Sequence, residues 1–181
     1  MIQKEGIPHM KAVELRKKTC CFTGHRDIPI DRTQEIAERT ANEVRRLIVN
    51  HGVRFFGVGG AIGYDMLAAR VLFRLRETEF PNIKVILVYP FDGFTDRWSP
   101  TQIADHQRLL PKYDKVVCVC DRPSREAYLT RDRHLVDGSA YCITYCTRNY
   151  GGTAYTVRYA RQQGVQVWNV AGIGNSRLKS I

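Results

Sequence analysis

The chain has 181 residues, of which 44% are hydrophobic and 25% are charged, a balance typical of a globular protein with a sizeable core. This length favours one domain, and the composition excludes wholesale disorder. A formal net charge of +10 favours anionic partners such as nucleotides, nucleic acid or acidic proteins. The basic residues comprise 20 arginines and 8 lysines, and the forked guanidinium group suits phosphate and carboxylate.

The ends of the chain carry no targeting or membrane signal. Every apolar run falls far short of the about 20 residues that cross a bilayer, so we expect neither a membrane span nor a membrane partner. Residues 1–18 are polar and of mixed charge, and they lack the apolar core of a secretory signal. The sequence therefore predicts a loose leader over 1–18, a cytoplasmic location and a tail over 171–181.

Six cysteines lie in or beside segments that we interpret as buried strands. They are Cys20, Cys21, Cys118, Cys120, Cys142 and Cys146. None of their spacings has the paired CxxC pattern of a zinc module. Because free cysteine behaves as a small hydrophobic residue, we expect core packing, with no disulfide and no metal site.

Strand-like runs alternate with helix-like runs from residue 19 onward. The strand-like runs are short, apolar and rich in β-branched residues, as strands buried on both faces should be. They cover residues 19–23, 54–58, 84–89, 115–119, 141–145 and 166–169. The alternation predicts an α/β protein with a single Rossmann-like three-layer domain and a mostly parallel sheet over 19–170.

Capping and breaking residues mark the expected helices between these strands. In chain order, the expected starts are Asp31, Tyr64, Ser99 with Pro100, Thr130 and Thr153, and the first and last helices should stop at Gly52 and Gly164.

Three loops at strand ends suit an anionic ligand. The first is Thr23-Gly24-His25-Arg26, directly after the first strand. Gly24 permits close backbone approach, Arg26 supplies a forked cation, and His25 offers a donor or an acceptor. A glycine turn followed by a surface arginine remains the alternative interpretation.

The second loop, Gly59-Gly60-Ala61-Ile62-Gly63-Tyr64-Asp65, joins the second strand to the second helix. Its glycines, Gly59, Gly60 and Gly63, free backbone N–H groups at a helix N-terminus, where the helix dipole attracts phosphate. Asp65 is predicted either to accept a hydrogen bond from a ribose hydroxyl or to stabilise the first helical turn. The pattern is neither Walker A nor the usual dinucleotide fingerprint, and a tight turn is the alternative.

The third loop is Gly151-Gly152-Thr153, which follows the fifth strand and repeats the same phosphate-binding logic. Thr153 is predicted to cap the last helix, to reach a phosphate oxygen, or both.

Weaker candidates lie at two further places. Pro90 stands between aromatic residues after the third strand, where a base would stack. Arg131, Arg133 and Asp137 share the short helix before the fifth strand. Ordinary core packing and a solvated arginine face are the alternatives here.

Together these motifs resemble the YpsA-like branch of the SLOG superfamily, the Rossmann-like group that also contains the DprA DNA-processing proteins and the LOG nucleotide hydrolases. The resemblance covers about residues 19–170 and rests on the three loops and on the run 131–137. It implies a pocket above the strand C-termini for a nucleotide or a nucleotide-derived signal such as an ADP-ribose or a nucleotide sugar. The LOG motif Gly-Gly-x-Gly-Thr-x-x-Glu is not matched, because Thr156 stands three positions after Thr153.

The leading hypothesis is a nucleotide-ligand binding or sensing domain, with phosphate on the second and third loops and no required cofactor or metal. A nucleotide N-glycosidic hydrolase is the first alternative, with His25, Asp65 or Asp137 as acid or base. A DprA-like nucleic-acid-binding protein is the second. The identity of the ligand, turnover and homo-oligomer formation stay open.

Overall fold

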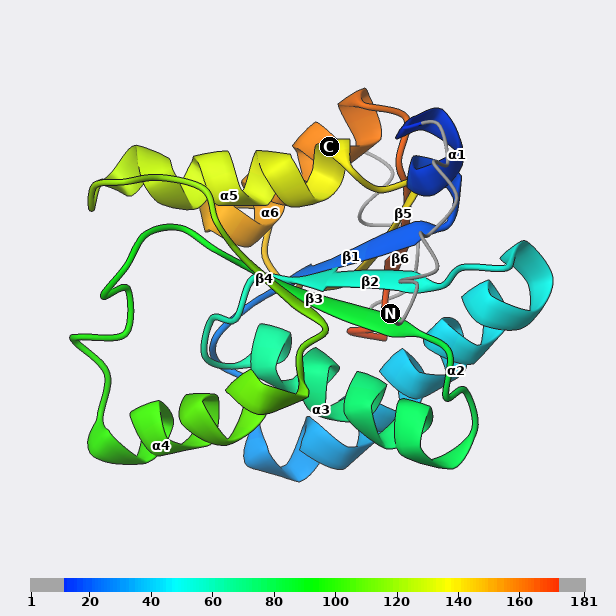
Figure 1. Ribbon diagram of the computed structural model, residues 1–181, viewed down its shortest axis with the longest axis horizontal. Coiled ribbons are helices and arrows are strands. Elements are labelled where there is room, and N and C mark those ends of the chain that lie inside the picture. The colour runs from blue at the N-terminus through cyan, green and yellow to red at the C-terminus, as the bar shows by residue number, and fades with distance from the viewer. Residues whose placement is uncertain (1–11, 173–181) are drawn as a thin grey trace, which may run out of the picture.

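The computed structural model describes residues 12–172 and shows a six-stranded sheet between two layers of helices (Figure 1). The strands are β1 (Thr19–Gly24), β2 (Phe55–Val58), β3 (Lys84–Tyr89), β4 (Lys115–Cys118), β5 (Tyr141–Tyr145) and β6 (Gln166–Asn169). The helices are α1 (Ala12–Lys17), α2 (Thr33–His51), α3 (Tyr64–Thr78), α4 (Pro100–Leu109), α5 (Arg125–Asp137) and α6 (Gly151–Gln162). Each predicted strand is confirmed to within one residue at either end.

All neighbouring strands pair in parallel, in the order β4-β3-β2-β1-β5-β6. The chain steps outward from β1 to β4 and then returns to the other side of β1 with β5. Strand order therefore reverses between β1 and β5, where Thr23 lies opposite Thr144. A crevice outside the carboxyl ends of the strands at such a reversal is the usual ligand site of an open α/β sheet.

The core forms on both faces of this sheet. Helices α2, α3 and α4 cover one face, and α5 and α6 cover the other (Figure 1). Phe22, Phe56 and Leu72 lie in the larger cluster, between the sheet and α2 and α3, and each is at most 2% exposed. The Rossmann-like three-layer architecture predicted from the alternation of elements is confirmed.

Capping residues set several helix ends as predicted. Ser99 forms a reciprocal capping box with Gln102 at the start of α4. Gly52 ends α2 in a left-handed conformation with φ of 63°. Helix α3 begins at Tyr64, and Gly164 follows α6 with φ of 72°.

Three predicted helix starts are wrong. A 3-10 turn over Ile30–Arg32 precedes α2, so Asp31 is not its cap. Helix α5 begins five residues before Thr130, because the Ser124 side chain accepts the backbone N–H of Ala127 and caps the helix there. Helix α6 begins at Gly151 rather than at Thr153, with Tyr150 in the N-cap position.

The cysteines and the chain ends also differ in part from expectation. All six cysteines are free, but Cys118 is exposed and Cys120 is half-buried, because both belong to the edge strand β4 or its loop.

Residues 12–17 form α1 where a loose leader was predicted. The rest of the predicted leader, and the predicted tail from residue 173, lie outside the described residues. No described helix has the length and apolarity to cross a membrane.

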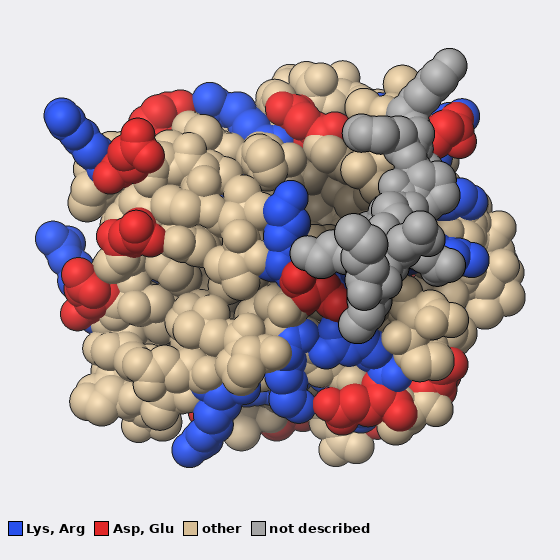
Figure 2. Space-filling model, in the orientation of Figure 1, with Lys and Arg blue, Asp and Glu red and all other residues tan. Residues whose placement is uncertain are grey.

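Basic and acidic side chains are interspersed on the face drawn in Figure 2. Several arginines pair across elements, as Arg45 does with Glu79 at 2.6 Å and Arg76 with Asp114 at 2.7 Å. Other Lys and Arg side chains lie next to one another below the centre of this face (Figure 2).

Tyr64, at the start of α3, is fully buried and its hydroxyl lies 2.9 Å from the Thr40 hydroxyl on α2. We predict that Tyr64→Phe lowers the free energy of unfolding by about 1 kcal/mol, because a buried hydrogen bond is removed. Urea denaturation measures the change. Tyr150→Phe, at a side chain that is 67% exposed, is the matched control and should stay within about 0.5 kcal/mol of the wild type. Equal effects of the two substitutions would contradict the prediction.

Candidate ligand-binding site

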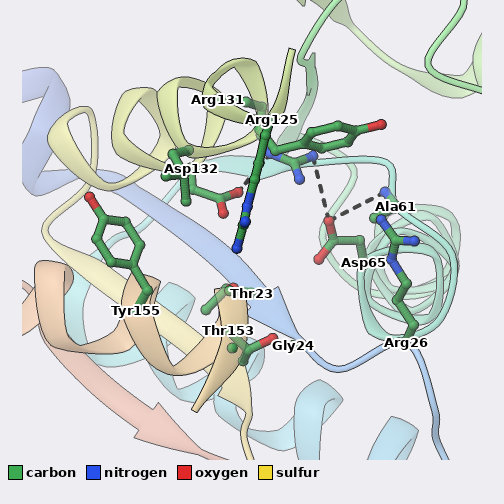
Figure 3. A pocket seen from close by; sticks show the side chains of 14 residues that line it. Thr23, Gly24, Arg26, Ala61, Asp65, Arg125, Arg131, Asp132, Thr153 and Tyr155 are labelled. Atoms are coloured by element: carbon green, nitrogen blue, oxygen red, sulfur yellow. Dashed lines mark hydrogen bonds and ion pairs between the residues drawn. The ribbon is translucent and has the colours of Figure 1, made fainter. Parts of the chain in front are cut away.

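A hollow of about 520 Å³ lies at the reversal of strand order. Its lining comes from the end of β1, from the loop before α3 and its first turn, from α5, and from the first turns of α6. The side chains in Figure 3 converge on this space from those separate elements. A volume in this range is typical of small-molecule sites.

The loop after β1 is tied to the loop after β5 by His25. Its backbone N–H donates to the Tyr145 carbonyl at 3.1 Å, and its Nε2 accepts the backbone N–H of Thr147 at 3.0 Å. Burial, with the positive charge of Arg148, lowers the pKa of His25, which favours the neutral ring that this acceptor role requires. His25 therefore holds two loops together.

The same loop is clamped against the start of α3. The backbone N–H of Tyr64 donates to the His25 carbonyl at 3.2 Å. A Cβ at Gly24 would lie 2.5 Å from Tyr64 Cδ1, and a Cβ at Gly63 would overlap the backbone of Arg26. Gly63 also has φ of 85°, which side chains rarely tolerate. Both glycines are needed for close packing of the two loops.

Arg131 is a buried cation on one wall of the hollow, 6% exposed. Its Nε donates to Asp132 at 2.7 Å, its Nη1 donates to the Gly59 carbonyl, and Nη1 lies 3.9 Å from Asp65 Oδ2. Two carboxylates and one carbonyl thus surround one guanidinium group, which joins α5 to the loop before α3. Arg131 has its charge compensated within the protein.

Asp65 faces the hollow from the first turn of α3 and is 6% exposed. The backbone N–H of Ala61 donates to its Oδ2 at 3.3 Å. Burial raises the pKa of the Asp65 carboxyl to about 6, although Arg131 opposes the shift. At pH 7 this group is mostly ionised, yet it is protonated more readily than an exposed carboxyl.

Two further arginines at the hollow are unpaired. Arg26 follows β1 and Arg125 opens α5, and neither guanidinium group makes a hydrogen bond or ion pair with any residue that the structure describes, although the positive charge of Arg26 helps to lower the pKa of Asp65. Both side chains are exposed. In Figure 3, Arg125 extends from α5 over the hollow toward Thr23 and Thr153, and Arg26 stands near Asp65 and Ala61. Two guanidinium groups are therefore available to an anion from outside.

The start of α6 forms the wall that faces Asp132. Gly151, Gly152 and Thr153 all line the hollow, and their N–H groups belong to a helical turn that lacks preceding carbonyl acceptors. A Cβ at Gly152 would meet no atom within 4 Å, so this wall is open to the solvent side. Thr156, one turn on, donates to Asp132 Oδ2 at 3.0 Å and fixes that carboxylate.

Seven of the residues predicted to bind ligand line this hollow. They are Gly24, Arg26, Asp65, Arg131, Gly151, Gly152 and Thr153. Their contact with a ligand stays a prediction, but the topology brings all three predicted loops to one place.

The other predicted residues lie behind the hollow or away from it. The Gly59 carbonyl accepts the hydrogen bond from Arg131 Nη1, and Gly63 packs against the backbone of Arg26. Gly60 has φ of 69° and faces Leu87, so it makes a turn. These positions shape the loop that carries Asp65.

Pro90 accepts a hydrogen bond from Cys120 N–H at 2.9 Å and does not line the hollow. Arg133 is engaged with the Tyr155 hydroxyl and with Glu126, both at 2.9 Å. His25 is held between two loops, as described above. The Pro90 carbonyl and the side chains of Arg133 and His25 are therefore all engaged within the protein.

The hydrolase hypothesis had three candidates for acid or base chemistry. Only Asp65 lines the hollow. Asp137 is exposed at the last residue of α5, the end farther from the hollow, and accepts the Tyr159 hydroxyl at 2.8 Å. No catalytic pair is therefore assembled from the predicted residues.

Sequence reasoning did not select Arg125, Tyr128 or Asp132 as site residues, and all three line the hollow together with Tyr155. Arg125 and Tyr128 precede the predicted helix start at Thr130, and recognising Ser124 as a cap would have placed them on α5. Asp132 lay inside a motif that we had noted, but its partnership with Thr156 depends on the packing of α5 on α6.

Within residues 12–172, no group of three or more His, Cys, Asp or Glu side chains could hold a metal ion. The hollow therefore contains two arginines without a protein partner, Arg26 and Arg125, the Asp65 carboxyl with its raised pKa, and the N-terminus of α6.

The fold and this hollow define a Rossmann-like α/β domain with a concave site at the reversal of its strand order. Residues 20–170 match the family model described as the YspA SLOG family, so the chain belongs to that family.

Curated relatives include a UPF0398 protein of Shouchella clausii, 30% identical over 86 residues that cover 48% of this chain and 46% of the relative. Another, from Staphylococcus epidermidis, is 23% identical over 135 residues, covering 70% of this chain and 71% of the relative. The chain thus matches about half the length of the first and over two thirds of the second.

Two solved structures share the fold at low sequence identity. DNA processing protein A from Helicobacter pylori, described for its single-stranded DNA binding mode, aligns with a TM-score of 0.61 and 17% identity over 94% of this chain and 75% of its own. DNA processing protein A from Streptococcus pneumoniae aligns with a TM-score of 0.60 and 15% identity over 82% and 48%. At this identity the likeness establishes the fold alone.

The raised pKa of Asp65 makes stability depend on pH. Between about pH 4 and 6 the unfolded chain releases this proton while the folded chain keeps it, so folding is penalised as pH rises. We predict that wild-type protein loses about 1–3 kcal/mol relative to Asp65→Asn between pH 4 and pH 7, measured by urea denaturation. Asp31→Asn, at an exposed carboxylate, is the control. A constant difference between wild type and Asp65→Asn would contradict the prediction.

Proposed function

We propose that this protein binds a nucleotide or a nucleotide-derived small molecule in the hollow at the β1 and β5 ends. The observation that carries the proposal is the pair of unpaired guanidinium groups, Arg26 and Arg125, which reach the same hollow from different elements. Forked guanidinium groups favour phosphate oxygens, and two of them suit a ligand with more than one phosphate.

The start of α6 supports the same ligand chemistry. Gly151 and Gly152 leave the backbone of the first turn uncovered, and the helix dipole makes this end partly positive. Together with the two arginines, this turn surrounds the hollow with groups that attract an anion.

The carboxylates of the hollow suit the sugar part of such a ligand. Asp65 and Asp132 each accept from Arg131 or lie near it, and each lines the hollow. A carboxylate oxygen accepts the hydrogen bond of a ribose hydroxyl. In this arrangement the phosphates lie toward Arg26 and Arg125, and a sugar ring of the ligand lies toward Asp65.

The test is a thermal-shift and calorimetric screen of nucleotides and nucleotide sugars. We predict a saturable stabilisation of the wild-type protein by at least one of them. Gly152→Glu should abolish it, because a Cβ at this position meets no protein atom within 4 Å and the added carboxylate places a negative charge at the start of α6. Gly152→Ala is the matched control and should keep binding within about twofold. The absence of any shift at millimolar ligand would contradict the proposal.

Binding of single-stranded nucleic acid is a second candidate, favoured by the fold shared with the DNA processing proteins. Its phosphates would use the same two arginines. The volume of the hollow, about 520 Å³, is typical of small-molecule sites, which favours the small ligand.

This second candidate predicts that affinity for an oligo-dT falls steeply with salt, by fluorescence anisotropy. Replacing both Arg26 and Arg125 with alanine should flatten the slope of log affinity against log salt by about 0.7 for each phosphate that the protein no longer neutralises. Arg54→Ala and Arg74→Ala, exposed positions outside the hollow, provide the control. The absence of binding at low salt would remove this candidate.

A further inference from the structure

A second hollow, of about 740 Å³, lies directly beside the first. The two share Arg26, Arg125 and Tyr128 in their linings. The remaining walls of the second hollow come from the loop between β3 and α4 and from the residues just before α5. Both of these loops project from the left end of the sheet in Figure 1, where the first hollow also lies. The two hollows therefore form one extended groove with the two unpaired arginines at their junction.

Aromatic rings line the second hollow. Phe94 meets Trp98 edge to face, with ring centroids 5.4 Å apart, and Tyr89 stacks on Phe94 from behind at 5.5 Å. On the opposite side, Tyr128 packs edge to face with Phe91 at 5.4 Å. The first hollow has no tryptophan or phenylalanine in its lining. Its aromatic side chains are the tyrosines Tyr128 and Tyr155, whereas the larger indole ring of Trp98 and the ring of Phe94 line the second hollow and offer the broader surface to a flat aromatic group.

The loop that carries these rings is held by its own hydrogen bonds. Phe94 N–H donates to the Phe91 carbonyl at 3.3 Å, and Trp98 N–H donates to the Thr95 carbonyl at 2.9 Å. The capping box of Ser99 then anchors the loop to α4. The aromatic wall is thus preorganised, which reduces the entropy lost when a ligand binds.

Charge sets the orientation of a ligand in this groove. Away from the junction, the second hollow is lined by two carboxylates, Asp92 and Asp96, and one cation, Arg97, and none of the three forms an ion pair with a described residue. Their net negative charge disfavours phosphate there, and the two carboxylates can accept N–H groups of a base. The arginines at the junction attract phosphate, while Asp65 and Asp132 in the first hollow suit sugar hydroxyls.

We infer that the second hollow is the base subsite of the binding site proposed above. The ligand is then a nucleoside diphosphate derivative that lies along the whole groove. Its base packs against Trp98 and Phe94, its diphosphate lies between Arg26 and Arg125, and its terminal sugar lies beside Asp65. This inference rests on the proposed function and adds the direction in which the ligand lies.

The chain carries two tryptophans, which makes the base subsite directly measurable. Trp98 lines the second hollow, whereas Trp168 lies on β6 under the Arg46 guanidinium at 4.3 Å, outside both hollows. In the Trp168→Phe protein, ADP-ribose or UDP-glucose should quench the remaining tryptophan fluorescence saturably. Ribose 5-phosphate, which has no base, should not. In the Trp98→Phe protein, the same nucleotides should leave the fluorescence of Trp168 unchanged.

Calorimetry with the same three probes completes the test. Trp98→Ala should weaken binding of the better nucleotide about tenfold or more, the loss expected for one stacked base, and leave ribose 5-phosphate within about twofold. Phe94→Leu is a second, milder variant, in case Trp98→Ala fails to fold, and it should weaken nucleotide binding by a smaller factor. Trp168→Phe is the control and should leave all affinities unchanged.

The outcomes separate this inference from the function on which it rests. If nucleotides bind but Trp98 reports no quenching and its substitution costs no affinity, the base subsite is wrong and the proposed function stands. If none of the three probes binds at millimolar concentration, the proposed function and the base subsite both fail.

Discussion

The arrangement of this protein follows from the strand order of its parallel sheet, which reverses beside the first strand, β1. Because β2 to β4 extend to one side of β1 and β5 and β6 to the other, the connecting helices must lie on opposite faces of the sheet. The loops that leave β1 and β5 lead to helices on opposite faces of the sheet, and His25 ties the two loops together beside the hollow. Arg26, Gly152 and Asp65 come from distant parts of the sequence and meet there.

Arg131 stabilises one wall of this space at an electrostatic cost. A guanidinium group that is 6% exposed must be compensated, and Asp132, Asp65 and the Gly59 carbonyl do so. The arginines of the hollow therefore differ in their partners. Arg131 is paired within the protein and holds the wall, whereas the guanidinium groups of Arg26 and Arg125 have no partner among the described residues.

Much of this fold could be predicted from local patterns. Short β-branched runs located all six strands, and Gly52, Ser99 and Gly164 marked helix ends, because these signals act through nearest neighbours. The start of α5 was missed because two residues with capping side chains, Ser124 and Thr130, lie six positions apart, and packing decides between them. Which residues line the hollow depends on the order of the strands in the sheet, and no local sequence pattern determines that order. That is why Asp132 and Tyr128 escaped notice, and why His25 and Gly59, though adjacent to the site, proved to support it from behind.

The close fit of Gly24 on Tyr64 and of Gly63 on Arg26 also limits how this binding site can change during evolution. The Gly24 backbone lies against the Tyr64 side chain and the Gly63 backbone lies against the Arg26 backbone, so neither loop can shift without the other. A change in the shape or charge of the hollow must then come from its outward-facing side chains, or from the loop between β3 and α4 that lines the neighbouring hollow.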